Sequence, residues 1–574
     1  MKRRLAKFVF VVSCTTLTLV GVSTWKKSSE AQSNSSRRRP PNIVMLIADD
    51  MGFSDLSLYG GEMSTPHINA LAKSGKMLTN FHGAPSCSPS RAMILSGMDN
   101  HIAGLGNMAE FLTPNQQGKP GYEGYINDRV VTLPQALKDA GYHTYMVGKW
   151  HLGGKPGQVP ADKGFEESFA LIEGAGGHLS DLGYSPDEPK GTYNSNGKVV
   201  QLPIAKYKEF YDSNFYTDRL IENIDSNRRD GKPFFIYGAY TQPHDPLQAP
   251  ERYIKKHLAT YSQGWDKIRA QRFENVKKLG LLPIPKDAKL PPRAKGVPAW
   301  DELTPDQQRY NAKKMAIYAA EAEILDENIG RLIDHLKKIG EYDNTLIVFL
   351  SDNGPAAHAF GEEPEYATWF KRDGIDNSYE NIGNANSFVS YGKGWAQVSA
   401  TPLLHIKGRV SEGGIRTPAI FAGGAIKPNS KTNAWVHVAD LMPTILDYAG
   451  AKHPGTTYKG RSVLPMQGRS FRPVLEGKAD RIYGDKDPLG YELYGGGNDA
   501  LYLGDWKILR LRPPYGNNQW QLFNVAQDPM ESKDLSQQYP EKKEQMIKLY
   551  AEYKKNVGCT DADKNDPYKG SDAL

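Results

Sequence analysis

The chain alternates short apolar runs with polar clusters and helix-like stretches. Four of the runs contain almost no polar residue, and each ends in a polar cluster. Such runs are typical of strands buried on both faces, as in a parallel or mixed sheet covered by helices. The runs are residues 43–48, 143–147, 234–240 and 346–350. We therefore predict an α/β fold with a large central sheet, mixed but mostly parallel, flanked by helices.

The clearest helix pattern lies between the third and fourth runs. Thr304 suits the N-cap, Pro305 the first helical position, Gln307 the capping box, and Gly340 the helix end. The apolar positions between them repeat at helical spacing, which predicts packing against a core. Residues 251–298 are rich in Lys, Arg and Pro. They predict a helical insertion at the rim of the ligand site that such sheets have beyond the carboxyl ends of their strands, with its basic residues on a solvated face.

After about residue 450 the pattern changes to short apolar segments separated by Gly, Asn and Asp. The segments are residues 500–503, 506–511 and 520–523. They predict a smaller C-terminal antiparallel sheet, followed by a helix around Glu541 to Lys555. We expect a large α/β domain over residues 42–449 and a C-terminal subdomain over residues 450–574.

The N-terminus has the layout of a secretory signal peptide. Basic residues in the first seven positions precede an apolar run from Phe8 to Val22. We predict a signal peptide over residues 1–24, with cleavage as late as residue 31 as an alternative, and a linker over residues 25–41. An uncleaved N-terminal anchor is the other interpretation. The expected location is periplasmic or secreted, with no membrane span in the mature chain.

Composition narrows the class of protein. The chain has 574 residues, of which 39% are apolar, and a formal net charge of +6. A balance this close to neutral argues against a dedicated nucleic-acid binder. The mean hydropathy of −0.57 argues against a multi-pass membrane protein. With Cys14 in the predicted leader, only Cys87 and Cys559 remain, too few for a disulfide framework. Cys559 has no predicted role, and the sequence leaves the oligomeric state open.

Oxygen-bearing side chains follow two of the four runs. Asp49 and Asp50 end the first run, and Asp352 and Asn353 end the fourth. If these strands are neighbours, the four side chains converge beyond their carboxyl ends. Oxygen ligands favour Ca²⁺ or Mg²⁺ over zinc. The same residues are also common in turns, so by themselves they leave both interpretations open.

A short motif elsewhere in the chain favours the metal-site interpretation over the turn interpretation. Cys87, Pro89 and Arg91 form a Cys-x-Pro-x-Arg pattern. With 3 Cys, 38 Pro and 71 Lys plus Arg, a Cys-x-Pro-x-basic pattern is expected by chance only roughly 0.02 times. The motif resembles the signature of the sulfatase family. The alternative is a small buried cysteine before a helix.

Further segments carry the same resemblance. Residues 148–153 are similar to the second signature of the family, residues 351–354 to its metal-binding turn, and Lys407 with residues 412–418 to its later basic segment. The resemblance extends from about Asn42 to about Phe523. Within the family, the chain looks most like bacterial arylsulfatases.

The resemblance implies an activity and a set of roles. Cys87 would be oxidised to formylglycine, whose hydrated aldehyde is the nucleophile, by a formylglycine-generating enzyme acting as a maturation partner. The implied cofactor is Ca²⁺, with Mg²⁺ as the alternative. Its implied ligands are Asp49, Asp50, Cys87, Asp352 and Asn353. Arg91 and Lys149 would hold the hydrate and the sulfate, His151 would act as base, and His244 with Lys407 would face the leaving oxygen, His244 as general acid.

We therefore expect hydrolysis of sulfate monoesters, with aryl sulfates as the first candidate substrates. A phosphonate monoester or phosphodiester hydrolase using the same site is the alternative enzyme. An inactive relative that binds sulfated glycans is a third interpretation, although a binder needs neither Cys87 nor an acid such as His244. For His82, His101 and His405 we expect structural or supporting roles.

Overall fold

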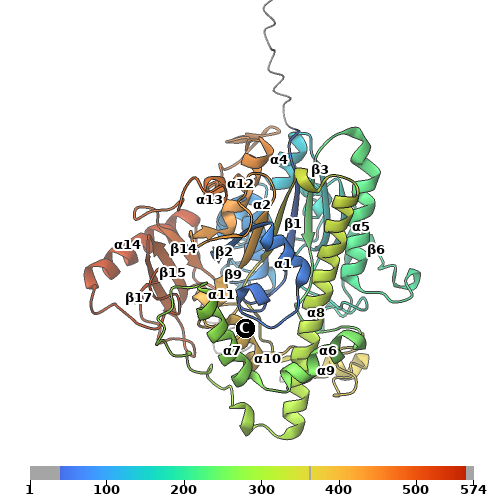
Figure 1. Cartoon of the computed structure of the whole chain (residues 1–574). Coiled ribbons are helices and arrows are strands. Elements are labelled where there is room, and N and C mark those ends of the chain that lie inside the picture. Colours follow the sequence, from blue (N-terminus) through green and yellow to red (C-terminus); the bar gives the residue numbers. More distant parts are fainter. Residues whose placement is uncertain (1–38, 361–362, 564–574) are drawn as a thin grey trace, which may run out of the picture. The chain divides into compact units, whose positions relative to one another are not determined.

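An eleven-stranded mixed sheet lies at the centre of the protein (Figure 1). The computed structural model describes residues 39–360 and 363–563. The predicted leader and most of the predicted linker therefore lie outside the described residues. The strand order is β10-β2-β9-β8-β1-β7-β3-β4-β5-β6, and β11 also pairs with β2. The strands are β1 (Asn42–Ala48), β2 (Gly75–His82), β3 (His143–Lys149), β4 (Glu167–Leu171), β5 (Tyr193–Ser195), β6 (Lys198–Val200), β7 (Phe234–Ala239), β8 (Thr345–Ser351), β9 (Arg416–Ala422), β10 (Ser430–Thr432) and β11 (Val436–His437).

The four predicted apolar runs form four neighbouring strands of this sheet. In the order β8-β1-β7-β3, each pairs in parallel with the next, so that Leu46 of β1 lies opposite Phe349 and Gly238. Their carboxyl ends consequently meet at one edge of the sheet. This confirms the predicted fold class and the predicted meeting of the polar clusters.

A fifth strand, β2, ends at the same edge, although the hydrophobic pattern did not single it out. β8 is antiparallel to β9, and β9 is antiparallel to β2. Two reversals make β2 run in the direction of β8. The chain therefore reaches the common edge again at His82, five residues before Cys87.

Both faces of the sheet are covered by helices. Alternate residues of β1 belong to separate cores, because successive side chains of a strand point to opposite faces: Val44 and Leu46 to one, Ile43 and Met45 to the other. The first core includes α1 (Pro66–Lys73), α5 (Asp212–Asn227) and α8 (Pro305–Lys338), and the second includes α2 (Cys87–Ser96), α4 (Leu133–Asp139) and α12 (Leu441–Ala449). The remaining helices include α3 (Asn100–Ala103), α9 (Pro364–Asp373), α10 (Gly392–Ala400), α11 (Glu412–Ile415) and α13 (Arg472–Leu475).

The long helix α8 begins as the capping residues predict. The backbone N–H of Gln307 donates to Thr304 Oγ1 at 3.3 Å, and that of Thr304 donates to Gln307 Oε1 at 2.9 Å. The helix ends at Lys338, and Gly340 follows with a φ of +76°. This left-handed conformation is one that glycine adopts readily at a helix end.

The predicted insertion is helical, but part of its basic face is buried. It contains α6 (Glu251–Tyr261) and α7 (Trp265–Leu279). Arg269 and Arg272 of α7 are buried, so the prediction of a solvated basic face is wrong for these two residues. The physical reason is pairing, since Arg272 Nη1 lies 2.6 Å from Asp55 Oδ1 in the interior.

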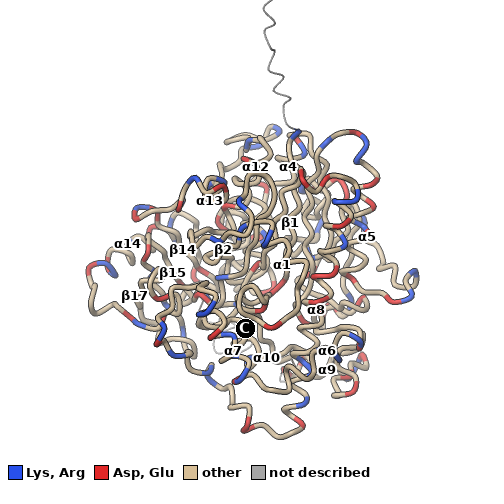
Figure 2. Tube along the Cα trace, viewed as in Figure 1, with Lys and Arg blue, Asp and Glu red and all other residues tan. Residues whose placement is uncertain are grey.

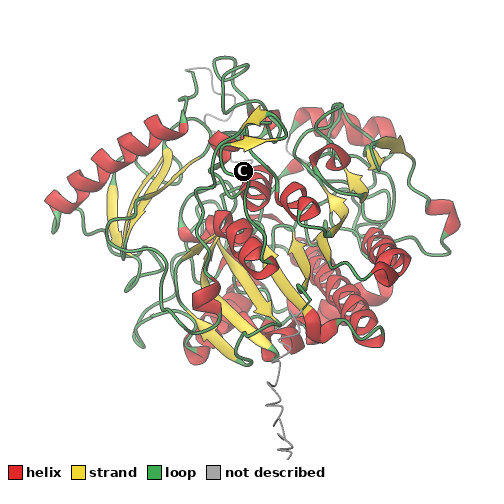
Figure 3. Ribbon diagram, turned by 90° about the horizontal axis from the view of Figure 1, so that it is seen from above, coloured by secondary structure: helices red, strands yellow, loops and turns green. Residues whose placement is uncertain are grey.

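The C-terminal part contains the predicted small sheet and helix. Its four antiparallel strands are β14 (Leu489–Glu492), β15 (Asn498–Leu503), β16 (Trp506–Leu511) and β17 (Gln521–Asn524). Helix α14 (Pro540–Val557) packs on one face through Met546 and Tyr550. Figure 3 shows this sheet and helix beside the main sheet. The pattern missed β14, which is short and only partly apolar. From Pro40 onward the described chain forms one unit, and the domain boundary near residue 450 stays a prediction.

Charge and hydropathy can be checked on the described residues. Lys and Arg are interspersed with Asp and Glu along the described part of the chain (Figure 2). Among the described residues, no helix combines the length and the apolar content that crossing a bilayer requires. Two short strands of two residues each, β12 (Thr457–Tyr458) and β13 (Arg461–Ser462), pair with each other in a separate antiparallel hairpin.

Candidate active site

Cys87 is the first residue of α2 and is almost fully buried at the common edge of the sheet. Its Sγ lies 2.9 Å from Lys407 Nζ, 3.5 Å from Asp49 Oδ1 and 3.7 Å from Asp50 Oδ1. Burial alone would raise the pKa of the Cys87 thiol, but the charges of Lys149 and Lys407 outweigh it and lower that pKa. The sulfur atom thus occupies a position where several charged groups meet.

The four oxygen-bearing side chains predicted to converge do lie together. Asp49 and Asp50 follow β1, Asp352 and Asn353 follow β8, and all four are buried. Asn353 Nδ2 donates to Asp50 Oδ1 at 2.6 Å, and the Asp50 backbone N–H donates to Asp352 Oδ1 at 3.4 Å. Asp50 has a φ of +64°, a left-handed conformation that is uncommon for Asp. The tertiary structure holds these residues in place against that local cost.

These residues fit a hard divalent cation. Asn353 Oδ1 is buried and has no hydrogen-bond partner, although an amide oxygen in the interior normally has one. Ligand atoms of Asp49, Asp50, Cys87 and His244 all lie within 4.8 Å of one another. Carboxylate and amide oxygens suit Ca²⁺ and Mg²⁺ alike. The donor set therefore supports a cation site without distinguishing the two metals.

Three cationic side chains surround the carboxylates. Lys149, at the end of β3, places Nζ 2.7 Å from Asp49 Oδ2. Lys407 places Nζ 2.8 and 2.9 Å from the two carboxylate oxygens of Asp50. Burial raises the pKa of Asp49. The surrounding positive charges, of which Lys149 contributes most, have a larger effect and hold that pKa well below its usual range.

Arg91 lies one turn along α2 from Cys87 and completes the cationic set. Its Nε donates to Asp352 Oδ2 at 2.9 Å, and its Nη1 donates to the Lys149 carbonyl at 3.0 Å. The guanidinium is fully buried. It therefore links the helix that carries Cys87 to the ends of β8 and β3.

His151 follows β3 with a φ of +56°. Its Nε2 lies 2.6 Å from Glu110 Oε1, and its Nδ1 is buried without a hydrogen-bond partner. Burial lowers the pKa of His151, but the carboxylate of Glu110, together with the nearby Cys87 side chain, outweighs this and raises it. Nothing in the sequence near Glu110 indicates this pairing, which only the fold creates.

His244 follows β7 and lies against Asp50. Its Nε2 is 3.3 Å from Asp50 Oδ2 and 3.3 Å from Lys407 Nζ. Burial lowers the pKa of His244, but the Asp50 carboxylate raises it well above its usual value. On the other side of the ring, Nδ1 lies 3.2 Å from Asp245 Oδ1. Asp245 also contacts His358 Nδ1 at 2.8 Å and accepts from the Tyr184 hydroxyl at 2.7 Å.

Sequence reasoning missed several residues that support the site. Asp245 had a signal, because it directly follows His244, whereas Tyr184 and His358 had none. Arg272 and Tyr318 were also missed, and both contact Asp55 in the loop after β1. The contacts are Arg272 Nη1 to Asp55 Oδ1 at 2.6 Å, Tyr318 hydroxyl to Asp55 Oδ2 at 2.7 Å, and Tyr318 hydroxyl to the Asp50 carbonyl at 3.3 Å.

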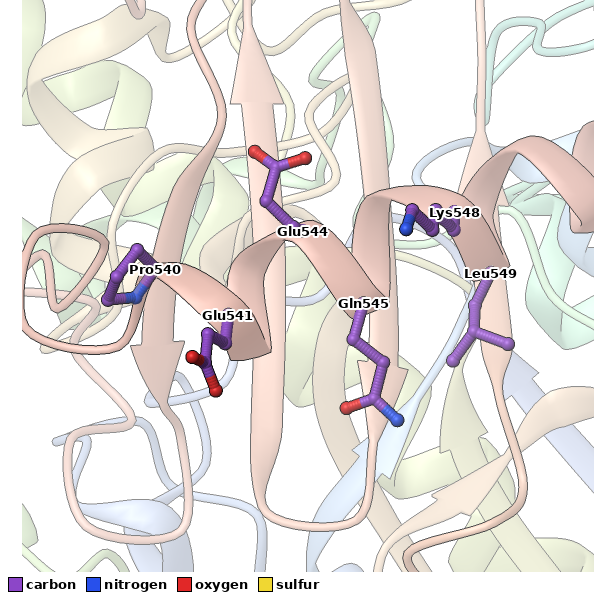
Figure 4. Close-up of a pocket in the computed structure, with 6 residues that line it drawn as sticks. All are labelled: Pro540, Glu541, Glu544, Gln545, Lys548 and Leu549. Carbon is purple, nitrogen blue, oxygen red and sulfur yellow. The ribbon is translucent and has the colours of Figure 1, made fainter.

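A surface hollow elsewhere has no connection with this chemistry. It has a volume of about 550 Å³ and is lined by Pro540, Glu541, Glu544, Gln545, Lys548 and Leu549. All of these belong to α14 (Figure 4). A groove along a single helix surface brings no strand ends together, so it is not a candidate active site.

The fold and the cluster together define an α/β protein whose candidate site lies beyond the carboxyl ends of parallel strands. The family model described as Sulfatase matches residues 41–451. The chain belongs to the sulfatase family.

Curated relatives agree with this assignment. An uncharacterized sulfatase of Schizosaccharomyces pombe is 41% identical over 542 residues, covering 91% of this chain and 95% of the relative. An arylsulfatase of Klebsiella aerogenes is 39% identical over 457 residues, covering 78% of this chain and 94% of the relative.

Solved structures share the fold. The crystal structure of Ps i-CgsB has a TM-score of 0.62 at 24% identity, covering 90% of this chain and 93% of that one. The phosphonate monoester hydrolase of Agrobacterium radiobacter has a TM-score of 0.52 at 17% identity, covering 90% and 96%. At these identities the likeness concerns the fold alone.

Proposed function

We propose that this sulfatase hydrolyses aryl sulfates and releases inorganic sulfate, with position 87 carrying the nucleophile. One observation carries the proposal: the Cys87 side chain is buried where Lys407, Asp49 and Asp50 lie within 3.7 Å of its sulfur. A sulfate monoester needs an activated nucleophile, positive charge around the sulfonyl oxygens and an acid for the leaving oxygen. The identity with the K. aerogenes arylsulfatase supports the aryl substrate class.

Two groups would add chemistry that the twenty amino acids lack. Formylglycine at position 87 would supply a hydrated aldehyde with two hydroxyl groups. A divalent cation held by Asp49, Asp50, Asp352 and Asn353 would polarise an ester oxygen and favour the ionised form of a hydroxyl nucleophile. We assign Ca²⁺ rather than Mg²⁺, since the resemblance to bacterial arylsulfatases and the expected exported location both favour it.

The residues of the chain have separate tasks in this reaction. Arg91 and Lys149 supply fixed positive charge for the hydrate and the sulfate, and Lys407 supplies it near the leaving oxygen. The Asp50 carboxylate raises the pKa of His244 and so favours the protonated ring, which can donate a proton to the leaving oxygen. His151 has an unpartnered Nδ1 that can accept a proton from a hydroxyl at position 87, and Glu110 stabilises the resulting charge.

A cluster of aromatic rings packed beside His244 supports an aryl leaving group. The Tyr184 ring lies edge-on to His244 with centroids 5.5 Å apart and to Phe360 at 5.6 Å. Phe360 in turn lies 4.9 Å from Phe388. Aromatic rings favour such edge-to-face and offset contacts, which an aryl group leaving from the His244 side would extend.

The proposal is tested with the purified chain, produced together with a formylglycine-generating enzyme. The mass of the peptide that contains Cys87 shows whether the cysteine has been converted to formylglycine. The rates of hydrolysis of matched nitrophenyl sulfate and aryl phosphonate esters show which ester the chain prefers. We expect an aldehyde at position 87 and a large preference for the sulfate. A preference for the phosphonate would favour the alternative hydrolase, and an unmodified, inactive chain in that host would favour the glycan-binding interpretation.

We also propose that the chain is exported to the periplasm or beyond, as its predicted signal peptide indicates. Export and maturation are coupled in this proposal, because the maturation enzyme must read Cys87, Pro89 and Arg91 before the chain folds. Cell fractionation with N-terminal sequencing of the product checks it. Intact Met1 on a cytoplasmic product would contradict export.

A further inference from the structure

A second cluster of metal-ligand side chains lies outside the candidate active site. His101 Nε2, Glu492 Oε2 and Cys559 Sγ belong to a group whose ligand atoms all lie within 4.8 Å of one another. The three residues come from α3, from the last position of β14 and from the segment just after α14. We propose that this cluster binds one divalent transition metal, with Zn²⁺ as the best match.

The donor types differ from those of the first site. An imidazole nitrogen, a carboxylate oxygen and a thiolate sulfur form a set that suits Zn²⁺ and disfavours Ca²⁺ and Mg²⁺. His101 and Glu492 are buried, while Cys559 is half-buried and gives access from the surface. The sequence predicts no role for Cys559, whereas in the structure its Sγ contacts Glu492 Oε2.

His101 is oriented as metal-bound histidines usually are. Its Nδ1 lies 2.8 Å from Asp99 Oδ1, and the other oxygen of Asp99 accepts from the Tyr553 hydroxyl at 2.8 Å. A carboxylate on one ring nitrogen fixes the tautomer and turns the other nitrogen toward a metal. Here that nitrogen is Nε2, which lies 2.9 Å from Glu492 Oε2.

Glu492 and Cys559 are held in the same way. Glu492 Oε1 accepts from the Gly496 backbone N–H at 2.7 Å, so Oε2 is left to the cluster. Cys559 Sγ lies 3.2 Å from that Oε2 and 3.8 Å from the Tyr122 hydroxyl. Each of the three ligands therefore has a partner behind it, which is the arrangement expected around a bound metal.

The spacing is close to that of a tetrahedral zinc site. Zn–N and Zn–O bonds of about 2.0 Å and Zn–S bonds of about 2.3 Å separate neighbouring ligand atoms by about 3.3 to 3.6 Å. The observed separations of 2.9 Å (Nε2 to Oε2) and 3.2 Å (Sγ to Oε2) need an outward movement of a few tenths of an ångström. Three protein ligands leave a fourth position for water.

Metal binding would replace protons in a balanced exchange. The metal takes the place of the Nε2 proton of His101 and the thiol proton of Cys559, so two protons leave for each ion bound. Without metal, His101 as an imidazolium between Asp99 and Glu492 satisfies the same groups. The metal would join the end of α14 to α3, and it would stabilise the folded chain by mass action.

The test uses a chain in which Cys559 is the only thiol, made by Cys14→Ala and Cys87→Ala. Titration with Co²⁺ reports thiolate ligation through a charge-transfer band in the near ultraviolet. We expect this band to saturate at one Co²⁺ per chain and to disappear when Zn²⁺ is added. Adding Cys559→Ser should abolish the band and adding His101→Gln should weaken Co²⁺ binding at least tenfold, whereas the control His143→Gln, outside the cluster, should leave the band unchanged.

The parent chain decides the proposal even if a variant fails to fold. A folded parent without the band, or a band that survives Cys559→Ser, would overturn it and leave a hydrogen-bonded imidazolium cluster. Zinc analysis of the wild-type chain, purified without chelators, provides an independent measurement. We expect one zinc per chain that remains after a calcium-selective chelator has removed the metal of the active site.

Discussion

The Nζ atom of Lys407 lies 2.9 Å from the Sγ atom of Cys87, although the two residues are 320 positions apart in the chain. The same ammonium group contacts both carboxylate oxygens of Asp50 and lies 3.3 Å from His244 Nε2. The resemblance implied that Lys407 faces the leaving oxygen. In the structure its Nζ contacts the Cys87 sulfur directly, so in the proposed mechanism one cation would stabilise charge at both places.

We expect Lys407→Met to lower kcat/KM on an aryl sulfate by about a hundredfold or more, because it removes charge stabilisation from a buried site. Lys452→Met, at an exposed position, is the control and should leave the rate unchanged. Steady-state kinetics on the two purified variants check this. Equal rates for the two variants would remove Lys407 from the proposed mechanism.

Cys87→Ala should lose hydrolysis of aryl sulfates almost completely while keeping its fold. Alanine removes the sulfur but keeps the backbone of the first turn of α2, and no formylglycine can form. Activity and circular dichroism of the variant give the two measurements. Normal turnover by a folded Cys87→Ala chain would contradict the assignment of the nucleophile.

Removal of the active-site metal should abolish activity and lower the melting temperature. Asp49, Asp50 and Asp352 lie together in the interior, and a bound cation stabilises the folded state that presents them. Asn353→Ala removes the unpartnered Oδ1 and should weaken the affinity for Ca²⁺ at least tenfold, as calorimetric titration would measure. Unchanged affinity would show that Asn353 is not a ligand.

Arg272→Met should destabilise the fold by about 3 to 5 kcal/mol, because it leaves the buried Asp55 carboxylate without its cation. Arg252→Met is the matched control: Arg252 pairs with Glu209 at the surface, and such pairs contribute at most about 1 kcal/mol. Chemical unfolding of both variants measures the difference. Similar losses would mean that the Arg272 pair does not brace the loop after β1.

Acid should destabilise the chain partly through His437. Burial, with a contribution from His82, lowers the pKa of His437 from 6.5 to about 3. The unfolded chain therefore takes up a proton below about pH 6.5 that the folded chain refuses, and stability falls as the pH drops toward 3. Between neutral pH and about pH 5, His437 alone should lower the free energy of unfolding by about 2 kcal/mol.

Replacing His437 by Gln removes the titrating group. The free energy of unfolding of His437→Gln should change less than that of the wild type between about pH 7 and pH 5, whatever its absolute value. Urea unfolding at several pH values measures both slopes. Parallel slopes would show that His437 does not contribute to acid sensitivity.

Local patterns were informative wherever a residue's environment follows from its neighbours in the chain. The four apolar runs became β1, β3, β7 and β8, because strands buried on both faces must be apolar throughout. The capping residues Thr304 and Gln307 correctly placed the start of α8, since a cap is made within one turn. The motif around Cys87 was also found in the sequence, because its three residues lie within five consecutive positions.

Contacts between distant segments were not predictable in this way. The pairing of His151 with Glu110, of Asp245 with His358, and of Arg272 with Asp55 depends on which loops the fold brings together. The grouping of His101, Glu492 and Cys559 depends on how α14 and β14 lie against α3. None of these leaves a periodic or short-range mark in the chain.

The sequence by itself determined the class of fold, the strands that end at the site and most of the residues with candidate chemistry. Apolar periodicity and short motifs express the requirements of burial and of local geometry, and both are present in the chain before it folds. The tertiary structure decided which charges neutralise one another and which histidines have an unpartnered nitrogen. Those properties depend on distances of a few ångströms between residues that are hundreds of positions apart, and only the assembled sheet and its loops set them.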